Sequence, residues 1–240
     1  MSAPELSVVI PAYNEAERLP RSLARVLEYL GARGGAWEVL VVDDGSRDGT
    51  AARARAVGGD AVRVLSNEAN RGKGYSVRRG MLEARGARRL MTDADLSTPI
   101  EELERLEARL AEGYDVAIAS RALPGANIEV RQPWFRENAG RAFNLLVQLL
   151  LLPGLRDTQC GFKLFSAAAA QAAFAPARLD GFSFDVEVLY IARRQGRRIV
   201  EVPVTWRNDA ATRVGSLKGL QAFADLLRIR AAAGRGRYGL

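Results

Sequence analysis

The feature that most constrains the fold is a regular alternation of short apolar segments and longer amphipathic ones over the first 120 residues. The short segments are rich in β-branched residues and predict strands, whereas the longer ones carry apolar residues three or four apart and predict helices. Strands are expected at Leu6–Ile10, Trp37–Val42, Ala61–Leu65, Arg89–Thr92 and Val116–Ala119, and helices at Glu15–Leu30, Asp48–Val57, Gly74–Ala84 and Glu101–Glu112. Strands that are apolar throughout are typical of a mainly parallel sheet with helices on both faces, so we predict an α/β fold.

The pattern changes after residue 124. The expected elements there are helices at Trp134–Leu152, Ala167–Ala170, Phe184–Gln195 and Gly215–Ala233, and short strands at Phe162–Phe165 and Arg198–Val202. A chain of 240 residues without internal repeats suits one large domain. We therefore predict a single domain over 1–240, made of a first half at 1–123, a second half at 124–214 and a basic C-terminal segment at 215–240.

Composition excludes several kinds of chemistry. Histidine is absent, which excludes a Ser-His-Asp triad, a Cys-His pair and a histidine-ligated zinc site. The single cysteine, Cys160, excludes an internal disulfide and fits a reducing compartment. Met1–Glu5 is too short and polar for a secretory signal, and the longest apolar run, Leu145–Pro153, is far shorter than the ~20 residues of a membrane span. We expect a cytoplasmic protein, soluble or peripheral to a membrane.

The net charge of +7 favours an acidic partner, which is a phosphorylated ligand, an anionic membrane surface or nucleic acid. An arginine-rich composition explains the charge equally well without any partner. No nucleic-acid-binding motif is present in the sequence, so we expect no nucleic acid partner.

Parallel sheets bind ligands at the carboxyl ends of their strands, so the residues just after each strand are the informative ones. After the first strand, Pro11 ends the strand and Asn14 is expected to cap the next helix, which leaves Tyr13 and Glu15 at the sheet edge. After the second, Asp43 and Asp44 are expected to face opposite sides, one of them into the cleft. A simple strand-to-helix turn with capping explains the first of these patterns as well.

Two further segments favour a diphosphate ligand. Asn70–Gly74 opens a helix with glycines that allow close approach, and the helix N-terminus with Lys73 favours an anion, although the segment is not a P-loop. Asp93 and Asp95 follow the fourth strand, and on an extended chain residues i and i+2 point the same way. With no lysine or histidine nearby in sequence, a divalent metal is the natural occupant between two carboxylates, and Mg²⁺ or Mn²⁺ suits oxygen ligands. A mere turn at Asp95 is the alternative.

Taken together, these motifs resemble those of a known family. The chain is similar to the inverting family 2 glycosyltransferases of GT-A fold, and within them to polyprenyl-phosphate sugar transferases, the branch of the dolichyl-phosphate β-glucosyltransferases and mannose synthases. The stretches that carry the resemblance, in order over residues 6–206, are SVVIPAYNE, VLVVDDGSRDGT, NRGKG, TDADLSTP, ASR at 119–121 and DTQCGFKLF at 157–165. The resemblance implies a GT-A fold with a nucleotide-sugar-binding half, an acceptor half and a divalent metal.

The resemblance also implies roles for individual residues. Those that would bind the nucleotide sugar are Pro11, Tyr13, Glu15, Asp44, Lys73 and Asp93. Asp93 and Asp95 would hold Mg²⁺ or Mn²⁺ with the diphosphate. Arg121 would face the sugar diphosphate or the acceptor, and Asp157 and Lys163 would lie near the transferred sugar and the acceptor phosphate. Asp185 would be the catalytic base, which makes Arg121, Asp157 and Asp185 the catalytic candidates. By its charge, Arg213 is expected to help Lys163 bind an acceptor phosphate. Capping of the helix that follows is an equally good explanation of Asp185.

The implied reaction moves a hexose, with inversion, from a nucleotide sugar to a polyprenyl or dolichyl phosphate. Ser97 stands where mannose synthases commonly carry glutamine, which favours UDP-glucose over GDP-mannose. The alternatives are a GDP-mannose-dependent enzyme with the same acceptor, and an enzyme that acts on a sugar or glycolipid hydroxyl with Asp185 as base. A sugar nucleotidyltransferase is less compatible, since its glycine-rich loop after the first strand is missing.

The C-terminal segment predicts a basic amphipathic helix. Its apolar residues recur mostly three or four apart, at Leu217, Leu220, Phe223, Ala224, Leu227 and Ile229, and its basic residues are Lys218, Arg228, Arg230, Arg235 and Arg237. Such a helix lies on a membrane surface and is attracted to anionic lipid. Packing of the apolar stripe on the sheet is the alternative.

Overall fold

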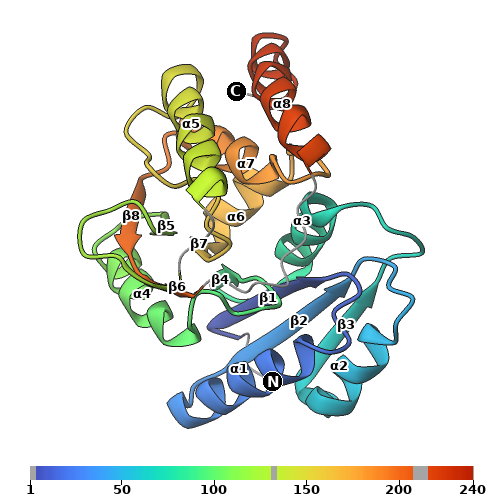
Figure 1. Cartoon of the computed structure of the whole chain (residues 1–240). Helices are drawn as coiled ribbons and strands as arrows, with labels where there is room; N and C mark the ends of the chain where they lie inside the picture. Colours follow the sequence, from blue (N-terminus) through green and yellow to red (C-terminus); the bar gives the residue numbers. More distant parts are fainter. Residues whose placement is uncertain (1–3, 131–133, 208–215, 240) are drawn as a thin grey trace.

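The computed structural model describes residues 4–130, 134–207 and 216–239, and it shows a central sheet with helices around it (Figure 1). Seven strands form the large sheet in the order β3-β2-β1-β4-β7-β5-β8. The strands are β1 (Leu6–Ala12), β2 (Trp37–Asp43), β3 (Val62–Ser66), β4 (Arg88–Met91), β5 (Val116–Ser120), β7 (Lys163–Ser166) and β8 (Ile199–Pro203). All neighbours are parallel except β7, which runs antiparallel to both β4 and β5. The predicted α/β class with a mainly parallel sheet is confirmed.

Helices cover both faces of this sheet. The α-helices are α1 (Leu19–Arg33), α2 (Thr50–Gly58), α3 (Lys73–Glu83), α4 (Leu103–Ala111), α5 (Trp134–Leu150), α6 (Ala167–Phe174), α7 (Phe184–Arg194) and α8 (Ser216–Gly234), with short 3₁₀ turns at Gly59–Ala61 and Ile100–Glu102. Side chains alternate along each strand, so neighbouring residues enter different cores. Val9 packs in a core with α3, α6 and α7, whereas Val8 packs in a second core with α1 and α4. Two apolar cores thus enclose the sheet, one on each face.

Some boundaries differ from the predicted ones. Helix α1 begins at Leu19 rather than Glu15, and its N-cap is Arg18, so the predicted cap at Asn14 is wrong. Asn14 instead has a φ of 53° and its side chain accepts a hydrogen bond from the backbone N–H of Arg47 (3.0 Å). The strand expected at Phe162–Phe165 is β7, one residue later along the chain and antiparallel.

A second, two-stranded sheet was not predicted. It pairs β6 (Asn127–Val130) with β9 (Thr205–Arg207) in parallel. The backbone N–H of Arg207 donates to the carbonyl of Ser97 (2.8 Å), which fixes β9 against the segment that follows β4. This contact brings the end of the second half of the chain to the carboxyl edge of the main sheet. The division of 1–240 into one domain with two halves stays a prediction.

Helices α5 and α8 lie side by side away from the sheet (Figure 1). The rings of Phe143 and Phe223 meet edge to face with centroids 5.5 Å apart, and Arg230 donates to the carbonyl of Leu150 (2.9 Å). Of the predicted stripe, Ile229 is buried in the core, and the side chains of residues 216–220 are outside the described part. Among the helices in the described ranges, none combines the length and the apolar character needed to cross a membrane.

Candidate active site

The loops after β1 and β2 are tied together at the carboxyl edge of the sheet. The backbone N–H of Glu15 donates to Thr50 Oγ1 (2.8 Å), and that of Ala16 donates to Asp48 Oδ2 (3.0 Å). Glu15 itself forms an ion pair with Arg18. Pro11 is partly buried and does not end the strand as predicted, because β1 continues to Ala12. The Tyr13 side chain is half exposed (45%) at the edge. The loop therefore presents an aromatic ring that suits stacking on a nucleobase.

Asp44 is buried and organises the next loop. Its Oδ1 accepts hydrogen bonds from Asn67 Nδ2 (2.7 Å) and the N–H of Arg71 (3.0 Å), and its Oδ2 accepts from the N–H of Gly72 (2.8 Å). The neighbouring carboxylate of Asp43 accepts from the N–H of Ser46 (3.3 Å). Asp44 thus fixes the turn that precedes α3, while its assigned contact with the base and ribose stays a prediction.

The glycines of this turn have a packing role that was not predicted. A Cβ on Gly72 would lie 2.3 Å from the carbonyl oxygen of Asp180, and one on Gly74 would lie 2.5 Å from that of Leu179. The backbone N–H of Gly74 donates to the Asp180 carbonyl (2.8 Å). These glycines therefore admit the 179–181 segment of the same chain, and the close approach of a ligand to them stays a prediction.

The turn places Lys73 on Asp93. The two side chains form an ion pair, with Lys73 Nζ 2.6 Å from Asp93 Oδ1, and both remain partly exposed. Burial alone would lower the pKa of Lys73, but the charges of Asp93 and Asp185 outweigh it and the pKa is raised, so the amine stays protonated. No lysine is near Asp93 in the sequence, but the packing of α3 beside β4 brings Lys73 to it.

Asp93 and Asp95 lie in a turn rather than on an extended chain. The strand β4 ends at Met91, the N–H of Leu96 donates to the Asp93 carbonyl (3.2 Å), and Leu96 has a φ of 47°. Asp95 Oδ1 accepts from the N–H of Ser97 (3.0 Å). The extended i, i+2 geometry is therefore wrong. Within the described ranges, no three side chains of Asp, Glu, Cys or His gather as a complete metal cluster.

Arg121 and Asp157 form a two-pronged ion pair at the end of β5. Arg121 Nε lies 2.7 Å from Oδ2 and Nη2 lies 2.8 Å from Oδ1, and the Arg121 guanidinium stacks over the ring of Trp206 at 5.2 Å. Burial alone would raise the pKa of Asp157, but the charge and hydrogen bonds of Arg121 lower it. A bidentate pair fixes the orientation of the guanidinium plane. The oriented guanidinium of Arg121 then supports the Trp206 ring on which it stacks.

Lys163 and Asp185 form a buried ion pair. Lys163 Nζ donates to Asp185 Oδ1 (2.5 Å) and to the carbonyl of Cys160 (2.6 Å), and the Lys163 side chain has no exposed surface. Burial raises the pKa of Asp185, and the charges of Lys163 and Lys73 offset this only in part. The N-cap of α7 is Ser183, so the alternative that Asp185 caps this helix is wrong. Lys163 lies beneath the site surface, and its role in acceptor binding stays a prediction.

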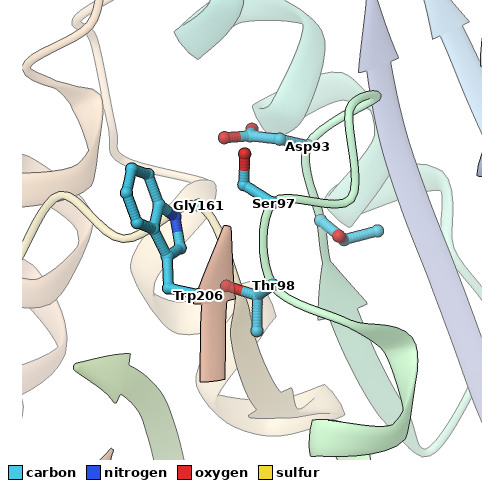
Figure 2. A pocket seen from close by; sticks show the side chains of 6 residues that line it. Asp93, Ser97, Thr98, Gly161 and Trp206 are labelled. Carbon is cyan, nitrogen blue, oxygen red and sulfur yellow. The ribbon is translucent and has the colours of Figure 1, made fainter. Parts of the chain in front are cut away.

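A small pocket lies between these groups, and the residues that line it are Thr92, Asp93, Ser97, Thr98, Gly161 and Trp206. Figure 2 shows Asp93 and Ser97 on one side of it and the Trp206 ring facing them. A Cβ on Gly161 would lie 2.0 Å from Asp93 Oδ2, so only glycine leaves room for the Asp93 carboxylate. The roles of Gly161 and Trp206 were not predicted, because neither carries a charge that marks it in sequence.

The structure therefore gathers most of the predicted residues at one edge of the sheet. Asp93, Lys73, Asp185 and Lys163 alternate in sign, and the charge of Asp185 acts on both lysines, so the four form one electrostatically coupled group. Arg213, predicted to bind the acceptor, lies outside the described residues. The site can bind an anion beside the Lys73–Asp93 pair, and the ring of Trp206 forms the wall of the pocket.

Comparison with known proteins identifies the class. A family model described as Glycosyl transferase family 2 matches residues 7–174. The chain belongs to this family and is a glycosyltransferase, as its motifs predicted. It is 40% identical to the dolichyl-phosphate beta-glucosyltransferase of Mus musculus, over 94% of this chain and 75% of that protein.

Solved structures show the same fold. The mannosyl-3-phosphoglycerate synthase of Rubrobacter xylanophilus has a TM-score of 0.72 at 20% identity, over 98% of this chain and 76% of that one. The glucosyl-3-phosphoglycerate synthase of Mycobacterium tuberculosis, solved with Mn²⁺ and UDP-glucose, has a TM-score of 0.69 at 22% identity, over 94% of this chain and 79% of that one. The predicted GT-A fold is confirmed.

Proposed function

We propose that this chain transfers glucose from UDP-glucose to a polyprenyl phosphate such as dolichyl phosphate, with inversion at the anomeric carbon. The observation that carries the proposal is the 40% identity to a dolichyl-phosphate beta-glucosyltransferase over 94% of the chain. The site supports it, because a half-exposed tyrosine and a lysine at a helix N-terminus suit a uridine diphosphate.

The donor site fits a divalent cation. Asp93 supplies carboxylate oxygens to the pocket wall, and Asp95 follows it two residues later in the same turn. Mg²⁺ commonly takes only one or two carboxylates together with substrate phosphates and water. The absence of a third acidic ligand in the described part is therefore compatible with such a site. The M. tuberculosis enzyme was solved with Mn²⁺ and UDP-glucose. When bound, the cation would neutralise the departing diphosphate.

The residues of the chain prepare this step. Lys73 Nζ adds positive charge beside Asp93, where the diphosphate would lie. The paired guanidinium of Arg121 holds Trp206 as the wall opposite Asp93, and a flat apolar wall of this kind excludes water from the transferred sugar.

The state of Asp185 favours a phosphate acceptor. A lipid phosphate is already an anionic nucleophile and requires no strong base, whereas a sugar hydroxyl does. Asp185 is buried and its Oδ1 is bonded to Lys163, so the carboxylate is held in an ion pair and is less available as a base than a free one. We therefore expect Asp185→Asn to lower kcat less than about tenfold, while a loss of 100-fold or more would favour the hydroxyl acceptor.

A membrane surface is the proposed location, at its cytoplasmic side. Helices α5 and α8 expose large apolar side chains, at Leu145, Leu146, Leu149, Phe223 and Leu227, and Leu149 is 71% exposed. Exposed arginines accompany them on the same helices, including Arg141 and Arg228, each of which also forms an ion pair within its helix, with Glu137 and Asp225 respectively. Contiguous apolar patches are rare on soluble monomers, and arginines around one are complementary to anionic lipid. A lipid acceptor gives such docking a purpose.

Vesicle flotation tests the membrane proposal. We expect the chain to float with phosphatidylglycerol vesicles at low salt, and the double variant Leu149→Gln/Leu227→Gln to stay in the soluble fraction. Val57→Gln, on the exposed face of α2, is the matched control and should float like the wild type. Wild-type protein that remains soluble with these vesicles would contradict the proposal.

Thermal shift tests the donor. UDP-glucose, UDP, GDP-mannose and GDP are compared with and without Mn²⁺, because a ligand that binds only the folded state raises Tm. The proposal predicts the largest rise with UDP-glucose and Mn²⁺ together. A larger rise with GDP-mannose would support the mannose alternative instead.

A further inference from the structure

The end of the chain returns to the core behind the donor site. Tyr238, four residues past the end of α8, is only 4% exposed. Its hydroxyl donates to Glu187 Oε1 (2.8 Å), and Glu187, in α7, is completely buried. A buried carboxylate needs its hydrogen-bond donors, so this contact determines where Glu187 lies.

The other oxygen of Glu187 holds the segment before α7. Glu187 Oε2 accepts hydrogen bonds from the backbone N–H groups of Arg178 (3.0 Å) and Leu179 (2.8 Å). The Arg178 guanidinium also reaches the carbonyl of Arg237 (3.4 Å). One carboxylate and two residues of the C-terminal segment thus fix the start of the 178–181 segment.

This segment in turn holds the start of α3. The Asp180 carbonyl accepts from the N–H groups of Gly74 (2.8 Å) and Tyr75 (3.3 Å), and the Asp180 carboxylate pairs with Arg78 (2.7 Å). Gly72 and Gly74 lack the Cβ that would keep the two segments apart. Lys73 lies between these glycines, and its side chain reaches Asp93.

We infer that Tyr238 and Glu187 are positioning residues that brace the donor-site turn from the C-terminal end of the chain. The brace runs from the Tyr238 hydroxyl through the Glu187 carboxylate and the 178–181 segment to the backbone on either side of Lys73. Neither residue touches the pocket, so both act through Lys73. The consequence for donor binding rests on the proposed function, whereas the consequence for the backbone does not.

The first test is hydrogen exchange on the ligand-free protein. Tyr238→Phe removes one hydroxyl and keeps the ring, and we expect the amides of residues 72–75 and 178–181 to exchange at least fivefold faster. Tyr114→Phe is the matched control, because its ring stacks on Arg198 (4.6 Å) just before β5, at the end of that strand opposite Arg121. Unchanged protection of Gly74 and Tyr75 in Tyr238→Phe would overturn the inference.

The second test is donor affinity. Tyr238→Phe and Glu187→Gln are each expected to weaken UDP binding about five- to tenfold and to raise KM for UDP-glucose, with kcat within about twofold of the wild type. A role confined to stability would lower Tm and leave the affinity of the folded protein unchanged, which would contradict the brace. If the wild type binds no UDP, the proposed donor fails, and hydrogen exchange still decides the inference.

Discussion

Replacing Lys163 with methionine is expected to destabilise the protein strongly. Methionine has a similar length but carries no charge, so the substitution removes the ion pair with Asp185 and the hydrogen bond to the Cys160 carbonyl without leaving a large cavity. Both partners are buried, at 0% and 5% side-chain exposure. Loss of one member of such a pair costs about 3–5 kcal/mol, because the buried partner loses the charge that is hydrogen-bonded to it.

The assay is urea unfolding with a thermal scan beside it. For a chain of this size, 3–5 kcal/mol corresponds to a fall in Tm of about 6–20 °C. The double variant Lys163→Met/Asp185→Leu removes both charges and should recover most of the loss, since apolar replacement of a whole buried pair is often neutral or stabilising. The control is Arg109→Met, whose partner Glu112 is half exposed, and its cost should stay below about 1 kcal/mol.

A loss of stability in Lys163→Met no larger than in Arg109→Met would contradict this prediction. The prediction would also be refuted if the double variant were less stable than the single one, because the deficit would then come from lost packing rather than from the isolated carboxyl.

Three further predictions follow from the same contacts. Gly161→Ala places a Cβ against Asp93 and should lower kcat/KM about 100-fold, the scale of a misplaced reacting group, with Tm within a few degrees of the wild type; near-normal turnover would contradict it. Burial raises the pKa of Cys160 from 9.0 to about 11, so the native thiol should resist a disulfide reagent at pH 8 and react once the protein is unfolded. Because the folded protein holds this proton more tightly than the unfolded chain, the free energy of unfolding should fall as pH rises from about 9 toward 11. Arg121→Lys keeps the charge but loses the two-pronged contact with Asp157 and the stacking on Trp206, so turnover should fall about 10- to 100-fold while circular dichroism is unchanged; full activity would show that the geometry is dispensable.

The strands, the class of fold and the edge that carries the site were predictable from sequence. Each depends on local pattern: apolar runs identify strands, and parallel strands place Tyr13, Asp44 and Asp93 at one edge. The sheet of β6 and β9 was missed because β6 is a short strand with mostly exposed residues, and its partner lies more than 70 residues away. A pairing of that range leaves no local signal.

The pairing of charges was not predictable either. Lys73 and Asp93 are 20 residues apart and meet only because α3 packs beside β4. The ion pair of Asp185 with Lys163, 22 residues earlier, likewise has no local signal in the sequence. The motifs identify which residues gather but not which of them neutralise one another. Gly161 is a similar case. The position requires glycine because a Cβ there would meet the Asp93 carboxylate, which is distant in the sequence.

The account is tested most directly by transfer of radiolabelled glucose from UDP-glucose to dolichyl phosphate. The purified chain is incubated with both substrates in phosphatidylglycerol vesicles, with Mn²⁺ or with excess chelator, and with Asp95→Asn as the matched variant. The expected product is labelled dolichyl β-glucosyl phosphate, which should form only with the cation. Its rate of formation should fall by orders of magnitude in the variant. No label in lipid, or transfer undiminished by chelator, would contradict it.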